Sequence, residues 1–248
     1  MDVNTERQVT VMAQYRYATE DHNYEDYAAG RVLLNRPGAT SFPVRLASEI
    51  FQQCAAALPD AAPYAVYDPC CGTGYLLTVL GLLYGEQISS LTAADIDPDM
   101  IAVAAKNLAL LSPAGMVARV TQLEHDRAAF GKPAHADALV SAHKLEKQLR
   151  PHIHIQVLTA DATQPGEHLP QGVQMLMTDV PYGRSKHWQG AGGITALLAA
   201  QKGALAVGGI AAIVSPKGET VQHPAYQRVR GFSIGKRQIT LLRLASLS

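Results

Sequence analysis

The segment Tyr67-Asp68-Pro69-Cys70-Cys71-Gly72-Thr73-Gly74 constrains the fold of this chain more than any other. It begins within residues 65–68, which are typical of a short strand. It precedes residues 75–84, whose apolar face predicts a helix. A glycine turn between a strand and a helix lets the backbone approach a ligand closely, at the carboxyl edge where α/β sheets bind ligands. The segment therefore predicts an α/β fold with a ligand site at the end of its first strand.

Strands and helices alternate through most of the chain. Strands are expected over residues 65–68, 88–95, 153–159, 173–178, 210–214 and 238–244, and helices over residues 75–84, from 98 towards 112, and 194–207. This alternation predicts an α/β fold, a mostly parallel sheet with helices on both faces. Residues 1–60 are expected to form an N-terminal extension and helix that packs on a core domain of residues 61–248. Residues 115–150 interrupt the alternation as a two-helix insertion.

Composition excludes several classes of protein. Hydrophobic residues make up 48% of the 248 residues, which is enough for a sizeable core. Lys plus Arg equals Asp plus Glu at 21 each, so any contact with nucleic acid must come from a local basic patch. The amino terminus has no apolar signal region, and no apolar run reaches the roughly 18 residues of a membrane helix. We expect a cytoplasmic protein with no membrane partner.

The cysteines do not indicate redox or metal chemistry. Cys54, Cys70 and Cys71 are too few for a disulfide framework and lack the spacing of a zinc site. We expect packed thiols beside a tight loop, and no metal.

Two classes of ligand bind glycine turns of this kind. A dinucleotide site needs a third glycine in the G-x-G-x-x-G frame, and Leu77 holds that place after Gly72 and Gly74. Asp68, just before the turn, favours a ligand with a cationic amino-acid end over a pyrophosphate. S-adenosylmethionine has such an end, and we expect Asp68, Cys70, Gly72 and Gly74 to bind it.

Further acidic residues follow the next two strands. Asp95 ends the second strand, where a carboxylate accepts hydrogen bonds from ribose hydroxyls. Asp97 is a second candidate for this contact, and its alternative role is a cap on the helix that begins at Pro98. Asp161 ends the third strand and can accept from an adenine amino group, although a loop-starting aspartate is an equally good interpretation.

The end of the fourth strand carries the most specific motif. Asp179-Val180-Pro181-Tyr182 resembles the Asn/Asp-Pro-Pro-Tyr signature of methyltransferases that act on planar nitrogens, with Val180 in place of the first proline. A carboxylate and a main-chain carbonyl can hold the hydrogens of such a nitrogen and aim its lone pair at a methyl group. The ring of Tyr182 can stack on a base taken out of its helix. Asp179, Pro181 and Tyr182 are therefore the candidate catalytic residues.

Basic and aromatic residues follow this motif. Arg184, Lys186 and Trp188 are interleaved next to it, and Lys217 is a fourth candidate contact to RNA. Other cations gather in the carboxyl-terminal third, at Arg228, Arg230, Lys236 and Arg237.

With these motifs together, the chain resembles the avilamycin-resistance rRNA guanine methyltransferases of the AviRa type. The resemblance rests on residues 42–47, 68–72, 75–83, 104–115, 130–133 and 179–183. It implies a Rossmann-like methyltransferase fold with a mostly parallel seven-stranded sheet. It also implies methylation of a guanine nitrogen in large-subunit ribosomal RNA by S-adenosylmethionine, and resistance to an orthosomycin antibiotic. It further implies that residues 42–47 help to close the cofactor pocket. The residues that it implies hold cofactor and target are Asp68, Gly72, Gly74, Asp95, Asp161 and Asp179.

Other interpretations of the same residues remain open. The fold can also methylate a small molecule or a protein amide, which the zero net charge would suit, or it can be an inactive cofactor-binding module. Both the modified nucleotide and the choice between ring nitrogen and exocyclic amine are open. Nothing in the sequence decides the oligomeric state, and a monomer is favoured.

Overall fold

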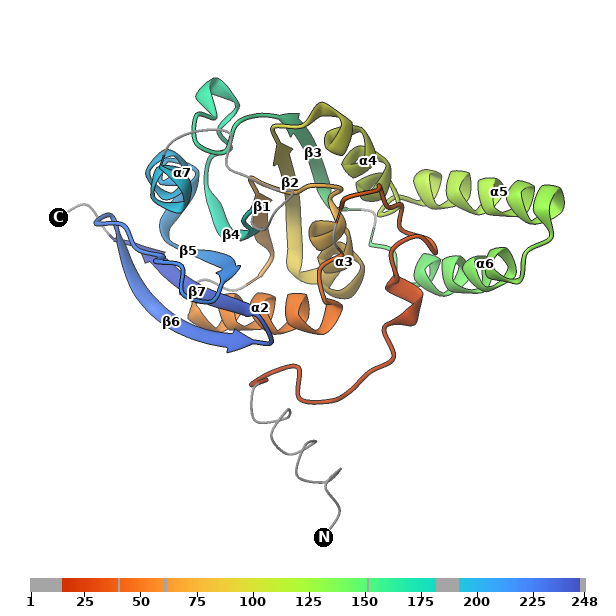
Figure 1. The fold of residues 1–248 in the computed structure, drawn as a ribbon, viewed down its shortest axis with the longest axis horizontal. Coiled ribbons are helices and arrows are strands. Elements are labelled where there is room, and N and C mark those ends of the chain that lie inside the picture. Colours follow the sequence, from red (N-terminus) through yellow and green to blue (C-terminus); the bar gives the residue numbers. More distant parts are fainter. Residues whose placement is uncertain (1–14, 40, 60–61, 151, 182–191, 246–248) are drawn as a thin grey trace, which may run out of the picture.

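The computed structural model describes residues 15–39, 41–59, 62–150, 152–181 and 192–245. Strands of these residues form one seven-stranded sheet in the order β3-β2-β1-β4-β5-β7-β6 (Figure 1). The strands are β1 (Tyr64–Asp68), β2 (Ile88–Asp95), β3 (His154–Thr159), β4 (Val173–Asp179), β5 (Leu205–Pro216), β6 (Tyr226–Ile234) and β7 (Arg237–Leu244). Pairing is parallel from β3 to β5, and β7 is antiparallel to both of its neighbours. The mostly parallel sheet expected from the sequence is confirmed.

Helices cover both faces of the sheet because its strands are apolar on both sides. The helices are α2 (Val44–Ala57), α3 (Tyr75–Tyr84), α4 (Pro98–Ala109), α5 (Pro113–Phe130), α6 (Pro133–Glu146) and α7 (Gly193–Gln201). Helices α2, α3 and α4 bury their apolar faces against alternate strand residues such as Val66 and Met177. Helix α7 packs with Tyr67 and Leu176 on the opposite face. Among the described residues, no single helix is long and apolar enough to cross a membrane.

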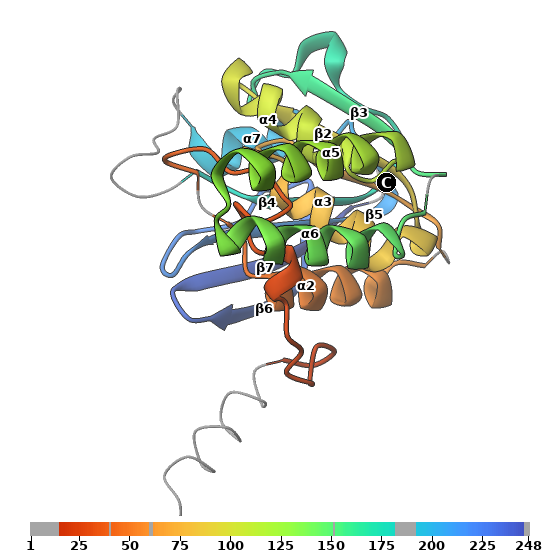
Figure 2. The ribbon, with the colours of Figure 1, turned by 90° about the vertical axis from the view of Figure 1, so that its right-hand side faces the viewer.

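The insertion is a helical hairpin made of α5 and α6. Ser112 caps α5, whose first residue is Pro113, and Gly131 ends it with a left-handed φ of 62°. Figures 1 and 2 show the two helices side by side, projecting from the body beyond α4. The two-helix insertion predicted from the sequence is present, and its first helix begins two residues earlier than expected.

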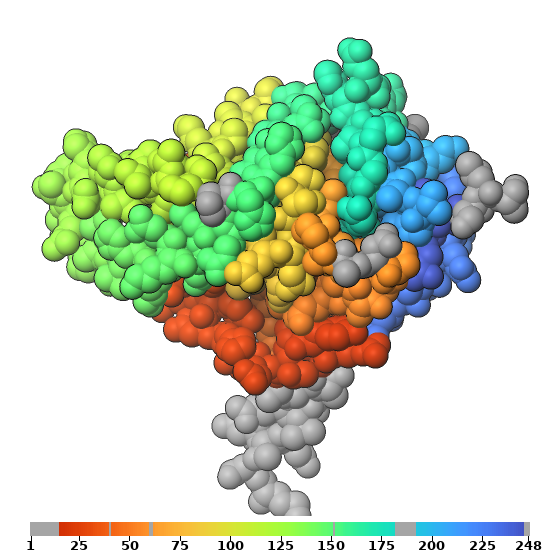
Figure 3. Space-filling model, turned by 180° about the vertical axis from the view of Figure 1, so that it is seen from behind, coloured from red at the N-terminus to blue at the C-terminus, as the bar shows by residue number. Residues whose placement is uncertain are grey.

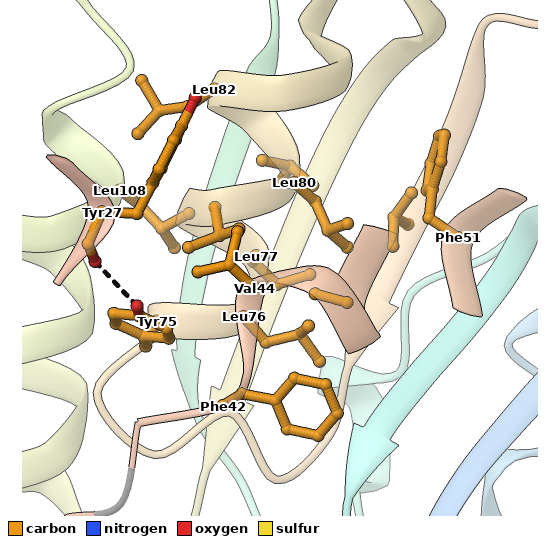
Figure 4. Close-up of a cluster of buried hydrophobic side chains, with 14 of the residues drawn as sticks. Tyr27, Phe42, Val44, Phe51, Tyr75, Leu76, Leu77, Leu80, Leu82 and Leu108 are labelled. Carbon is orange, nitrogen blue, oxygen red and sulfur yellow. Dashed lines mark hydrogen bonds between the residues drawn. The ribbon is translucent and has the colours of Figure 1, made fainter. Parts of the chain in front are cut away.

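Residues 15–39 and 41–43 lie along the surface without regular structure except for a short turn of helix, η1 (Glu25–Tyr27). Figure 3 shows this segment as a band against both α2 and the insertion. The Tyr27 hydroxyl donates to Gln148, and the Tyr75 hydroxyl at the start of α3 donates to the Tyr27 carbonyl at 2.7 Å (Figure 4). These contacts join the amino-terminal segment to the end of the insertion and to α3, the helix that follows the glycine loop. The division of the chain into two parts near residue 60 stays a prediction.

Two expectations about the carboxyl-terminal third were wrong. Helix α7 ends at Gln201, not at residue 207, and β5 already begins at Leu205. The glycines at 208 and 209 do not interrupt β5: Gly208 has a φ of 78°, and a Cβ at Gly209 would lie 3.0 Å from the Val173 carbonyl oxygen of β4. They therefore allow an irregular, close pairing. Strand β6 had no signal in the sequence, because it is an outer strand whose residues are mostly polar and exposed.

Candidate active site

The glycine loop that follows β1 is held by main-chain and carboxylate hydrogen bonds. The Asp68 side chain accepts from Cys70 N at 3.0 Å, and Cys71 N donates to the Ala94 carbonyl of β2 at 2.8 Å. Gly72 N donates to the Asp95 carboxylate at 2.8 Å. The loop is therefore fixed across the ends of two adjacent strands.

The two glycines of the loop differ in what surrounds them. Gly72 and Gly74 both have left-handed φ, 53° and 69°. A Cβ at Gly74 would lie 3.0 Å from Ala104 Cβ, so this residue lets the loop pack closely on α4. A Cβ at Gly72 would meet nothing within 4 Å, so the backbone faces open space there. Gly72 is the glycine placed to border a ligand.

Asp95 and Asp97 occupy different roles at the end of β2. Asp95 accepts from Gly72 N and from Asp97 N, which holds its carboxylate against the loop. Asp97 caps α4 by accepting from Asp99 N and Met100 N, and it pairs with Arg36 at 3.3 Å. The capping alternative for Asp97 is confirmed, which leaves Asp95 as the better candidate for a ribose contact.

Asp161 follows β3, and its carboxylate stabilises the turn in which it lies. Its Oδ1 accepts from both the main-chain N and the hydroxyl of Thr163, at 2.8 and 2.7 Å. The loop interpretation of this residue is therefore supported, and an adenine contact stays a prediction.

Asp68 is the one carboxylate of this edge that is almost fully buried, with 2% of its surface exposed. Burial raises its pKa to about 7, and the nearby charges of Asp95 and Asp179 add to the rise, against the hydrogen bond from Cys70 N. Burial also raises the pKa of the Cys70 and Cys71 thiols. Both thiols are thus neutral; Cys71 is buried, and Cys70 is half-buried beside the loop.

The raised pKa of Asp68 predicts a pH dependence of cofactor affinity. A cationic amino group beside Asp68 favours the carboxylate, so below about pH 7 binding must expel a proton and should weaken roughly tenfold per pH unit. Because the folded pKa lies above the ordinary 3.8, the protein without cofactor should also lose stability as pH rises towards 7.

Calorimetry with S-adenosylhomocysteine, which carries the same amino-acid end, measures this dependence. The affinity of Asp68→Asn should be weaker and flat with pH. An unchanged wild-type affinity between about pH 5.5 and 7 would contradict the assigned role of Asp68.

Asp179 lies at the end of β4, beside the glycine loop of the neighbouring strand. Arg237, the first residue of β7, places its Nε 4.0 Å from the Asp179 carboxylate, and each side chain is roughly one-quarter exposed or less. The Arg237 guanidinium also lies over the Phe42 ring, 5.5 Å from its centre. Phe42 belongs to residues 42–47, the segment expected to close the cofactor pocket. Through Arg237, this segment therefore lies near Asp179 at the carboxyl end of β4.

Several of the candidates cannot be placed. Tyr182, Arg184, Lys186 and Trp188 lie outside the described residues. Pro181 follows Asp179 and Val180 at the end of β4 and is half-buried. Their predicted roles stay predictions.

Lys217 is exposed just after β5, and its main-chain N donates to the Lys236 carbonyl at 3.3 Å. Strand β5 pairs in parallel with β4, opposing Val214 to Asp179. Lys217 therefore stands at the same edge of the sheet as Asp179, as an RNA contact requires.

Two residues that fix the site had no assigned role in the sequence. Asn107 on α4 is fully buried and donates to the Thr73 carbonyl of the glycine loop at 2.8 Å and to the Leu34 carbonyl at 3.0 Å. Arg36 pairs with Asp99 at 2.7 Å and with Asp97. A buried amide on an apolar helix face was the only signal for Asn107, and Arg36 had none.

The sheet order and the glycine loop define the class of protein, a Rossmann-like methyltransferase fold. TrmN from Thermus thermophilus shares this fold, with a TM-score of 0.51 and 16% identity over 83% of this chain and 50% of that one. The family model of the rRNA methyltransferase AviRa matches residues 12–237. The chain belongs to the AviRa family of rRNA methyltransferases.

Relatives in Streptomyces viridochromogenes are similar over almost the whole chain. A 23S rRNA (guanine(2535)-N(1))-methyltransferase of that organism is 37% identical over 246 residues, 95% of this chain and 98% of the relative. The solved structure of its rRNA methyltransferase aviRa has a TM-score of 0.83 and 37% identity, covering 92% of this chain and 96% of that one.

Proposed function

We propose that this protein transfers a methyl group from S-adenosylmethionine to N1 of a guanine in large-subunit ribosomal RNA. The observation that carries the proposal is the 37% identity to the guanine-N1 methyltransferase along nearly the full length of both chains. The structure adds a carboxylate, Asp179, at the sheet edge beside the glycine loop. Because the proposed substrate is ribosomal RNA, we expect the protein to act in the cytoplasm.

The loop has the properties that the cofactor needs. The open side of Gly72 admits a ligand against the backbone, and Asp68 can meet an ammonium group with its buried carboxylate. Asp95 is fixed where it can accept from ribose hydroxyls. When bound, S-adenosylmethionine supplies an electrophilic methyl on a positively charged sulfur.

Asp179 serves as the proton acceptor for the target nitrogen. Guanine N1 carries a hydrogen, and its electron pair becomes available to the methyl carbon only as that proton leaves. The N1–H bond breaks and its proton passes to the Asp179 carboxylate, while the N1–methyl bond forms and the sulfur–methyl bond breaks, its electron pair returning to sulfur. The Arg237 Nε lies 4.0 Å from this carboxylate, on the same edge of the sheet.

Transfer of labelled methyl to isolated rRNA tests the proposal. Label from S-adenosylmethionine should enter 23S rRNA or large subunits and not 16S rRNA. Label that enters only protein or a small molecule would contradict it. Expression in a host sensitive to avilamycin should also raise the inhibitory concentration, as the family's resistance role requires.

A further inference from the structure

The charges of this chain are separated along the sequence. Residues 180–248 contain nine Lys and Arg but a single acidic residue, Glu219, for a net charge of +8. Residues 1–179 contain twelve Lys and Arg and twenty Asp and Glu, for a net charge of −8. The zero net charge of the chain is therefore the sum of a negatively charged segment, residues 1–179, and a positively charged segment, residues 180–248.

The described part of the positively charged segment, residues 180–248, lies on one side of the molecule. Strands β5, β7 and β6 are adjacent and end the sheet, and Figure 1 shows them with α7 on the side opposite the insertion. Strand β6 is the outermost, so one of its edges and much of its surface face solvent.

Four cations on these strands and turns have no acidic partner in the part of the chain that the structure describes. Lys217, Arg228 and Lys236 are exposed and Arg230 is half-buried, and none of the four forms an ion pair with a described residue. Like charges gathered on one surface repel each other, which costs stability unless an anionic partner compensates.

These cations follow the β6–β7 hairpin and the turn beside it, starting at the edge of the sheet that carries Asp179. Lys217 and Lys236 lie in adjoining turns, and β7 begins directly after Lys236 with Arg237, the neighbour of Asp179. Arg228 lies eight residues before Lys236, about 26 Å away at 3.3 Å per strand residue.

The absence of a side chain at Gly231 leaves space for the Arg228 side chain on this surface. A Cβ at Gly231 would overlap the Arg228 guanidinium, so the glycine lets this side chain lie along the strand. A guanidinium presented in this way suits the oxygens of a phosphate.

We infer that the β6–β7 hairpin, together with Lys217, binds the phosphate backbone of the RNA beside the target guanine. The four cations Lys217, Arg228, Arg230 and Lys236 are called the phosphate track. Repeated phosphates match cations that follow the hairpin from the edge that carries Asp179, and phosphate contacts position a nucleic acid without reading its sequence. This inference rests on the proposed function and adds the surface and direction along which RNA lies.

Two double variants test the phosphate track. Arg228→Ala/Arg230→Ala and Lys217→Ala/Lys236→Ala each remove two charges, and Lys132→Ala/Lys147→Ala in the insertion is the matched control, since both lysines are exposed. Affinity for 23S rRNA is measured between about 50 and 200 mM salt. Calorimetry with S-adenosylhomocysteine shows that each variant retains its fold.

Each track variant should lower the slope of log affinity against log salt by about 1.5 and weaken binding at least about tenfold, and the insertion variant should match wild type. At saturating RNA, kcat should stay within about threefold of wild type, because these residues do not touch the reacting atoms. Unchanged slopes in both track variants, or an equal loss in the insertion variant, would overturn the inference.

Three further outcomes separate this inference from the proposed function. If the wild-type enzyme methylates 23S rRNA while the track variants bind RNA normally, only the inference fails. If those variants lose activity on assembled large subunits but bind naked RNA normally, the hairpin contacts ribosomal protein, and the phosphate track is wrong. A wild-type protein that transfers no methyl to RNA or subunits would instead contradict the proposed function.

Discussion

Asp179→Asn is expected to lower kcat by about 10²- to 10⁴-fold while the affinity for S-adenosylhomocysteine stays within about twofold. The amide has the shape of the carboxylate and can still accept a hydrogen bond, but it cannot take the N1 proton. Its contact with Arg237 is only a 4.0 Å pairing at a partly exposed site, so the fold should persist. Single-turnover transfer of labelled methyl to rRNA measures the loss.

The same variant separates the two kinds of guanine nitrogen. An exocyclic amine needs only hydrogen-bond acceptance before it attacks, and an asparagine amide could supply that. A ring nitrogen needs a base, so the residual rate of Asp179→Asn should rise roughly tenfold per pH unit as N1 ionises by itself. Asp137→Asn, on the exposed surface of α6, is the matched control and should match wild type. A near wild-type rate for Asp179→Asn would exclude Asp179 as the base.

Glu49→Ala is expected to cause the largest loss of stability, about 3 kcal/mol or more. Glu49 is fully buried on α2, and its carboxylate accepts from the main-chain N of Arg16, Tyr17 and Ala18 at 2.8–2.9 Å. It also accepts from Gln53 at 2.6 Å. Removing it leaves these donors without an acceptor and releases the amino-terminal segment. Thermal unfolding should shift down by roughly 6–12 °C for a chain of this size.

The pH dependence and a control sharpen this prediction. The hydrogen bonds from Ala18 N, Arg16 N, Gln53 and Tyr17 N outweigh burial and lower the pKa of Glu49 below 4.5. A lowered pKa gives stability that is present at pH values above the ordinary pKa and is lost as pH falls through the pKa of the folded protein.

Glu86→Ala, which breaks an exposed pair with Arg150, is the control and should shift the unfolding temperature by less than about 2 °C. If Glu49→Gln and Glu49→Ala both melted like wild type, the segment would not be held by this carboxylate.

The elements that carry the chemistry could be predicted from the sequence because their signals are local. The glycine turn, the helix over residues 75–84 and the strand over residues 88–95 match α3 and β2, since apolar periodicity and turn residues decide them directly. The capping alternative for Asp97 rested on Pro98 at the first helical position and was also confirmed.

The missed features depend on contacts between distant residues. Among the described strands, β6 pairs only with β7, and its polar sequence has no apolar alternation to mark it. Arg237 meets Asp179 and Phe42 only because β7 is inserted next to β5 in the sheet, and no spacing along the chain encodes that order. Asn107 and Glu49 act on main-chain groups that lie 73 and 31–33 residues away, which local patterns do not reveal.

The identity of the methylated nucleoside tests the central claim most directly. Large-subunit rRNA is methylated by the enzyme in vitro, digested to nucleosides and separated by liquid chromatography with mass detection, beside standards of 1-methylguanosine and N2-methylguanosine. We predict that all new label elutes as 1-methylguanosine and that Asp179→Asn reduces it by at least about 10²-fold. Label in N2-methylguanosine, in another base or in the ribose would contradict the assignment of Asp179 as the proton acceptor for guanine N1.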